Sequence, residues 1–546
     1  LSLKMQGRHR AAFDAFYKAI WNAEPQAAGY FELARLAAHS QRFDEALDLT
    51  TRSLRRNWLH HPARHLRIAL LRRQGHTDEA TQIIEEALTL DRFEYGALWE
   101  QGLLGGEDAT RHLRGDVHTF VDLALNYAHA GLFDEAVDLL QRAPQDDPMP
   151  HYYRGWVLAH AGQQDAASEA FAQAATTSTD FCYPNRLESV LALQAAIAAS
   201  PQDAHAPYLL GNFWYAHRRY DEAIDCWEQA RALEPSFATV QRNLGLAYYN
   251  KRQDAERAQQ AYETAFTLDP GDGRVLFELD QLYKRRNRAP ADRLSLLEQH
   301  SHLVDGRDDL TIERITLLNV LGRHDEAYRR IIARNFHPWE GGEGKVTAQY
   351  VWSLVERARQ AIDDARYADA VADLGAAQVY PPNLGEGKLY GAQENHIFYH
   401  LGRAYAGMGN TQKAEDAWQR AAVGLSEPSS AMFYNDQPPD MIFYQGLARR
   451  ALGREDDARI IFRKLIDYGR AHMDDDVQID YFAVSLPDFL VFDEDLQQRN
   501  RIHCHYMMAL GHLGLGETNA ADAHFNAVLA LRADHLGAQI HRGLSD

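Results

Sequence analysis

The chain contains few cysteines and no long apolar run. Only Cys182, Cys226 and Cys504 occur among 546 residues, which is too few and too scattered for a disulfide framework. A reducing cytoplasm is therefore the expected compartment. A membrane-spanning helix needs about 18 or more consecutive apolar residues. The sequence has no such run, so no membrane span is expected.

Basic residues are also in the minority. Lys and Arg number 57 against 77 Asp and Glu, so the formal net charge is −20. A protein that binds nucleic acid usually carries a basic patch that neutralises phosphates. The acidic balance therefore argues against nucleic acid as the main partner.

Common catalytic and metal-binding motifs are missing as well. The sequence has neither C-x-x-C nor H-E-x-x-H, and it has no G-x-S-x-G around a serine nucleophile. Histidine is abundant, at 26 residues, but the triplet His503-Cys504-His505 places its two histidines on different faces of a helix. We therefore expect no metal and no cofactor, and we predict no catalytic residue.

What the chain does contain is a recurring alanine. Ala12, Ala46 and Ala80 lie 34 residues apart. A helix–turn–helix unit of this length resembles the tetratricopeptide repeat (TPR). One such unit cannot bury its own apolar face, so neighbouring units must stack into a solenoid. Nine more alanines follow a turn at the start of a predicted second helix: Ala136, Ala167, Ala223, Ala258, Ala327, Ala370, Ala414, Ala458 and Ala521.

The clearest repeat begins near residue 204. Gly211 and Ala223 are small, which lets the two helices of the unit approach closely, and Trp227 fills the space between helices. Pro235 ends the second helix because proline lacks an N–H and clashes with the preceding turn. The sequence thus predicts an all-α TPR solenoid with about thirteen helix pairs in a right-handed superhelix.

The spacing of the repeats divides the predicted array into three parts. Residues 1–200 hold the N-terminal repeats, 201–335 hold the most regular ones, and 336–546 hold longer repeats with alanine intervals of 43 and 44 residues. The first seven residues resemble the end of a first helix, so the array starts in the middle of a repeat. We expect this chain to be the C-terminal part of a longer protein, because solenoids need a polar cap at their ends.

Two loops in the last part share the tetrapeptide G-E-G-K. They lie at 342–345 and 385–388, one local repeat apart, so they should stand side by side on one edge. A helix N-terminus disfavours the final lysine of each loop, which therefore needs a glutamate or a bound anion. The loops are either a structural pair or a ligand cleft suited to a sugar. The residues of that cleft would be Trp339, Glu340, Glu343, Lys345, Asn383, Glu386 and Lys388.

A hydrolytic function for the same loops is a third hypothesis. Glu343 and Glu386 come from adjacent repeats, whose helices pack about 8–10 Å apart. Glycosidase carboxylates stand about 5–9.5 Å apart, so the pair is geometrically conceivable. A phosphate-binding P-loop is excluded, because Pro382 replaces its first glycine and Leu389 its Ser or Thr.

Two further surfaces are candidates for binding. The stretch 480–495 is rich in aromatic and acidic residues and is either a segment that docks onto the groove or a binding lip, to which 434–436 could add. In TPRs that bind chaperones, five polar residues on three first helices clamp a peptide carboxylate. Glu278 places an acid where such a clamp needs a cation, so we do not expect a carboxylate clamp. The other matching positions, predicted to line a concave binding face, are Tyr208, Asn212, Asn243 and Arg274.

The C-terminal stretch also resembles a particular family of large bacterial proteins. The resemblance rests on F-H-P-W-E-G-G-E-G-K at 336–345, N-L-G-E-G-K at 383–388, S-L-P-D-F-L-V-F-D-E-D-L at 485–496 and R-N-R-I-H-C-H-Y at 499–506. It covers residues 204–546. Those proteins join an N-terminal mutarotase-like β-sandwich domain of unknown function to a TPR array. The resemblance implies a setting in carbohydrate utilisation.

These observations predict a non-enzymatic TPR scaffold. Its partner would be a protein segment, or the N-terminal domain that the resemblance implies, held in the concave face. Any catalysis would then reside in that other domain. The alternative is a sugar-binding or glycoside-processing accessory module that uses the G-E-G-K loops.

Overall fold

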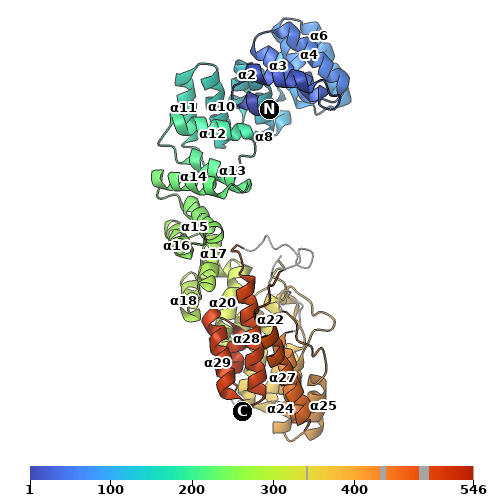
Figure 1. Cartoon of the computed structure of the whole chain (residues 1–546), viewed down its shortest axis with the longest axis vertical. Coiled ribbons are helices and arrows are strands. Elements are labelled where there is room, and N and C mark those ends of the chain that lie inside the picture. Colours follow the sequence, from blue (N-terminus) through green and yellow to red (C-terminus); the bar gives the residue numbers. More distant parts are fainter. Residues whose placement is uncertain (340–341, 431–437, 479–490, 545–546) are drawn as a thin grey trace. The chain divides into compact units, whose positions relative to one another are not determined.

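The structure is a computed structural model that describes residues 1–339, 342–430, 438–478 and 491–544. Throughout these residues the regular structure is helical, and they contain no β-strand, as the repeat pattern predicts. The chain divides into two compact units, residues 1–240 and 241–546. Figure 1 shows the successive helices of each unit packed in antiparallel pairs.

The N-terminal unit is built from fourteen α-helices and one short 3₁₀ helix within its described residues. These are α1 (Ser2–Met5), α2 (His9–Ala19), α3 (Gln26–His39), α4 (Phe43–Arg56), α5 (His61–Arg73), α6 (Thr77–Leu90), α7 (Tyr95–Leu103), η1 (Ala109–Leu113), α8 (Val117–His129), α9 (Phe133–Arg142), α10 (Pro148–His160), α11 (Gln164–Ala174), α12 (Leu187–Ala199), α13 (His205–Ala216) and α14 (Tyr220–Leu233).

The C-terminal unit begins within α15 (Ala238–Arg252) and continues in the same style. Its other described elements are α16 (Ala255–Leu268), α17 (Gly273–Arg285), α18 (Pro290–Gln299), α19 (Ser301–Asp305), α20 (Asp308–Val320), α21 (His324–Ile332), α22 (Lys345–Asp363), α23 (Tyr367–Ala377), η2 (Pro382–Leu384), α24 (Asn395–Gly407), α25 (Thr411–Ala421), α26 (Pro439–Ala451), α27 (Glu455–His472), α28 (Leu496–Gly514), α29 (Thr518–Leu531) and α30 (Leu536–Arg542).

The recurring alanines share one structural position. Each of the twelve is the fourth residue of its helix, and each is at most 2% exposed. Ala223, for example, is completely buried in α14. A larger side chain at this position would separate the two helices of the repeat. The prediction that these alanines start the second helices is confirmed.

Glycine and an aromatic ring pair within the clearest repeats. A β-carbon at Gly211 would lie 2.5 Å from the indole ring of Trp227, so only glycine lets the ring lie flat on the first helix. Gly402 and Trp418 repeat the arrangement, with a corresponding distance of 2.2 Å. In each of these repeats, the contact packs the second helix directly against the first.

One repeat breaks the alanine rule. In α18 the fourth residue is Arg293, and its side chain is only 1% exposed. The interval of 69 residues between Ala258 and Ala327 leaves room for a diverged repeat here, but it gives no indication that an arginine would occupy the alanine position. A buried guanidinium needs carboxylate partners. Those of Arg293 come from distant parts of the C-terminal unit.

Candidate functional site

The two G-E-G-K loops meet through Glu386. Its carboxylate accepts a hydrogen bond from the backbone N–H of Gly344, with 3.1 Å to each oxygen, and another from the Thr347 hydroxyl at 3.4 Å. Gly344 directly precedes α22 and has a φ of 73°, a left-handed conformation that suits glycine. Glu386 therefore caps the N-terminus of α22 from the neighbouring loop.

Two other predicted ligand residues also hold the loops in place. Lys388 donates to the Glu394 carboxylate at 2.5 Å and to the backbone carbonyl of Gln378 at 3.0 Å. The side-chain amide of Asn383 donates to the carbonyls of Ile331 and Arg334, each at 2.9 Å. These contacts favour the structural interpretation for Asn383, Glu386 and Lys388.

The remaining residues of the predicted cleft lie nearer the surface. The Trp339 ring is half-buried and covers Gly342, because a β-carbon there would lie 2.2 Å from the indole. Glu343 and Lys345 are exposed. Glu340 falls outside the described residues, as do residues 434–436 of the other predicted lip and residues 480–490.

The predicted concave face contains two sets of contacts, one in each unit. In the N-terminal unit, the Trp227 Nε1–H donates to the Tyr208 carbonyl at 3.2 Å and to the Asn212 side chain at 3.1 Å. The Tyr208 ring packs on Phe237 with 4.7 Å between centroids. Both predicted residues thus support the Trp227 ring.

In the C-terminal unit, Glu278 is a buried acceptor for three donors. Arg242 makes a bidentate pair with it at 2.6 and 2.7 Å, Arg274 donates at 2.9 Å, and the Tyr262 hydroxyl donates at 3.0 Å. Burial opposes ionisation, but the hydrogen bonds and charge of Arg242 lower the pKa of Glu278 below its ordinary value. Arg242 also donates to the Asn243 side chain at 3.1 Å. Arg274 is therefore already paired with an acid.

A cavity of about 610 Å³ lies within the N-terminal unit, lined chiefly by α3, α5, α7 and α8. Arg35 on its wall donates to Glu32 and to the Asn126 side chain, both at 2.9 Å. The Nε of Arg35 and the Nδ1 of His61 are buried and have no hydrogen-bond partner within the described residues. Both nitrogens are closed off from solvent, and His61 Nδ1 lies 3.9 Å from a Glu94 oxygen, so they belong to the polar wall behind the cavity surface.

The lining of this cavity also includes an aromatic ring and an acid. Phe93 is 50% exposed, and the neighbouring Glu94 is buried. Burial raises the pKa of Glu94 to about 7, although its carboxylate accepts the Ala97 N–H and lies near Arg64. The cavity could not be found from sequence motifs, because its residues come from several helices and the loops between them.

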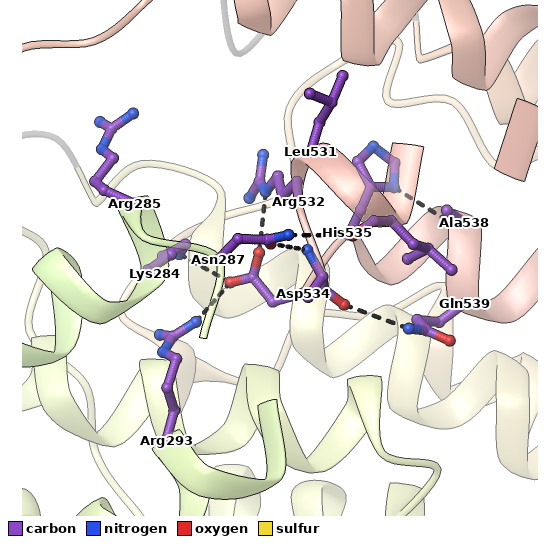
Figure 2. Close-up of polar contacts among 12 residues, drawn as sticks. Lys284, Arg285, Asn287, Arg293, Leu531, Arg532, Asp534, His535, Ala538 and Gln539 are labelled. Carbon is purple, nitrogen blue, oxygen red and sulfur yellow. Dashed lines mark hydrogen bonds and ion pairs between the residues drawn. The ribbon is translucent and has the colours of Figure 1, made fainter. Parts of the chain in front are cut away.

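The buried Arg293 connects distant parts of the C-terminal unit. Its guanidinium lies 2.8 Å from Asp280, 3.1 Å from Glu313 and 2.8 Å from Asp534. Figure 2 shows Arg293 and Lys284 pointing at Asp534 from one side, with Arg532 on the other.

Asn287 makes the neighbouring contact. Its side chain donates to the Ala530 carbonyl at 2.7 Å and accepts the Ala533 N–H at 2.5 Å. The last repeat is therefore linked by side-chain contacts to α17, to α18 and to the turn between them.

The described residues show neither a metal site nor a membrane helix. They contain no group of three or more His, Cys, Asp or Glu side chains placed to hold a metal ion. No helix among them is both long and apolar enough to cross a bilayer.

Comparison with known families identifies the repeats. A family model described as TPR repeat matches residues 215–252, and models described as tetratricopeptide repeat match 185–225 and 440–468. The chain contains tetratricopeptide repeats. Together the matched segments contain α12, α13, α14 and α15 in full and most of the α26–α27 pair.

Several solved structures match the chain at low identity and low TM-score. The TPR domain of P58(IPK) is 12% identical, covers 78% of this chain and 98% of its own, and has a TM-score of 0.22. A tetratricopeptide repeat protein from Parabacteroides merdae is 14% identical, with 56% and 99% covered and a TM-score of 0.25. MamA from Desulfovibrio magneticus RS-1 is 21% identical, with 35% and 93% covered and a TM-score of 0.20.

Proposed function

We propose that this chain is a TPR scaffold that binds an extended segment of a protein partner. TPR helix pairs present long curved surfaces with little chemistry of their own, which suits recognition rather than catalysis. The observation that carries the proposal is the cavity of about 610 Å³ in the N-terminal unit, whose lining includes the half-exposed Phe93 ring and the polar side chains of Asp122 and Arg186. The backbone of an extended peptide can hydrogen-bond to such polar side chains, and an apolar side chain of the peptide can pack on the Phe93 ring.

The identity of the partner is the finer part of the proposal. The resemblance of the C-terminal stretch to large bacterial proteins supports an N-terminal mutarotase-like domain of the same protein as partner. It also supports a setting in carbohydrate utilisation, while the scarcity of cysteine supports a cytoplasmic one. Tyr208, Asn212, Asn243 and Arg274 would then act by shaping the repeats, since each takes part in contacts within its own unit.

A peptide library displayed on phage and selected on the full chain tests this function. Selected peptides should bind the wild type and lose at least tenfold in affinity on Phe93→Ala, because Phe93 lies at the cavity. Phe181→Ala is the matched control, since Phe181 is 89% exposed in the same unit and does not line the cavity. Peptides that bind equally well to both variants would show that this cavity is not the binding site.

A sugar-binding function of the G-E-G-K loops is the second candidate. It is favoured by one observation, the half-buried Trp339 ring beside the exposed Glu343 and Lys345. A glycan array probed with the wild type and Trp339→Ala tests it. Binding that disappears in the variant while helical content is kept would support the sugar site, and an array without bound glycans would end it.

A further inference from the structure

A short non-helical segment of the C-terminal unit is held on α15 by one asparagine. The Asn250 side chain donates to the Val491 carbonyl at 2.9 Å and accepts the Asp493 N–H at 2.9 Å. Both bonds go to backbone atoms, so the amide would hold any chain of the same conformation regardless of its side chains. The backbone on either side of Phe492 is thus bound by one side chain.

Phe492 provides the apolar part of the contact. Its side chain is 2% exposed, and its ring meets Tyr249 at 4.9 Å and Tyr262 at 5.7 Å, both edge-on. Tyr249 lies on α15 and Tyr262 on α16, so the ring is inserted into a repeat. Burial of an aromatic ring between two others is a strong anchor for a bound segment.

Two acidic residues follow the anchor and meet basic ones. Asp493 lies 3.7 Å from Lys251, and Glu494 lies 3.5 Å from Arg285 on α17. The side chains of Asp493 and Lys251 are 66% and 26% exposed, so their pair adds selectivity for charge more than affinity.

We propose that the face formed by α15, α16 and α17 is a binding site for a partner segment in which an aromatic residue is followed by two acidic residues. Residues 491–494 of the chain itself fill this site in the structure. A partner segment with an aromatic residue followed by two acidic residues displaces them. The proposal deepens the proposed function, on which it rests, by naming a second site and the chemistry of its ligand.

Residues 491–494 are part of the same chain as their binding site, and this determines how tightly the wild type can bind a free peptide. A segment in the same chain competes at an effective concentration of about a millimolar, so a free peptide meets strong competition. Vacating the site should therefore reveal peptide binding that the wild type masks.

The experiment measures fluorescence anisotropy of a labelled peptide, Gly-Gly-Val-Phe-Asp-Glu-Asp-Gly, with the full chain. Phe492→Ala with Asp493→Ala should bind it at least tenfold more tightly than the wild type. Adding Asn250→Ala to that variant should lower the affinity at least tenfold. A control peptide with alanine in place of phenylalanine should not bind.

Asp493→Lys is the second variant, in case the double substitution impairs folding. It changes a side chain that is 66% exposed and leaves Phe492 in place. The reversed charge faces Lys251, so the variant should bind the peptide more tightly than the wild type does. Equal affinity for the wild type and the vacated variants, or binding that Asn250→Ala leaves unchanged, would overturn the proposal. Such a result would leave the proposed function standing, because that is tested independently at Phe93.

Discussion

Arg293 and Asp534 are 241 residues apart in sequence, yet the Arg293 Nη1 lies 2.8 Å from the Asp534 Oδ2 in the buried interior of the C-terminal unit. The side chains are 1% and 4% exposed. Burial opposes ionisation of Asp534, but the positive charges of Lys284, Arg532 and Arg293 lower its pKa below the ordinary value. Arg293 occupies the position where a standard repeat has a small alanine, and its pair with Asp534 connects two parts of the chain that are distant in sequence.

Replacing Arg293 should strongly destabilise the C-terminal unit. Arg293→Met leaves three carboxylates near one another without their shared cation, which should cost about 3–5 kcal/mol in the free energy of unfolding. Arg532→Ala is the control, because that side chain is 48% exposed and its pair with Asp534 should contribute less than about 1 kcal/mol. Urea unfolding followed by circular dichroism measures the free energy of unfolding of both variants. Equal losses would show that Arg293 is not the shared cation of the three buried carboxylates.

The contact between Glu386 and Gly344 gives a second prediction. Glu386→Ala removes the cap of α22 and should lower the free energy of unfolding by about 1 kcal/mol. Glu343→Ala, an exposed substitution in the neighbouring loop, should change it by less than about 0.5 kcal/mol. If the midpoint of urea unfolding shifts equally in both variants, Glu386 does not stabilise the helix.

The alanine position itself can be tested in the N-terminal unit. Ala223→Leu should overpack the α13–α14 pair and cost about 1–3 kcal/mol, because Ala223 is completely buried at the closest approach of the two helices. Ala216→Leu adds the same atoms at an exposed position of α13 and should leave the melting temperature nearly unchanged. A variant of Ala223 that melts like the wild type would refute the repeat register.

Buried histidines should make the C-terminal unit sensitive to acid. Burial lowers the pKa of His541 to about 4, while an unfolded histidine titrates near its ordinary value. The unfolded state therefore binds the proton first as pH falls, so the stability that neutral His541 contributes is present above about pH 6.5 and is lost toward pH 4. At pH 5 the loss from this histidine alone should be about 2 kcal/mol.

The variant His541→Gln isolates this contribution, because glutamine does not titrate. Between pH 7 and pH 5 its free energy of unfolding should fall by about 2 kcal/mol less than that of the wild type. Urea denaturation of the wild type and the variant at both pH values gives the four free energies of unfolding that the comparison needs. Parallel losses in the two proteins would show that His541 is not the group responsible.

The helical repeats could be predicted from sequence because their determinants are local. The alanine that begins each second helix, as at Ala223 and Ala414, and the glycine that receives an aromatic ring lie within one repeat of each other. The contact between the two G-E-G-K loops also follows from spacing, since consecutive repeats must stack. A periodic sequence thus determines which residues are buried inside a unit and which loops are neighbours.

The roles of those loop residues needed the tertiary structure. Glu386 caps α22, the helix that begins at the other G-E-G-K loop, rather than facing an open cleft, and Lys388 pairs with Glu394, because their side-chain directions depend on the exact path of the loop. The cavity beside Arg35 and the site occupied by Phe492 likewise join residues from several helices. No spacing rule connects such residues.

The sequence by itself thus determined the all-α repeat architecture and the register of its helices. Only the tertiary structure decided where Arg293 would find Asp534 and where Asn250 would hold the backbone around Phe492. The physical reason is that each repeat adds a small rotation, and these rotations accumulate. Contacts between repeats that are not neighbours depend on the accumulated sum, which no single repeat encodes.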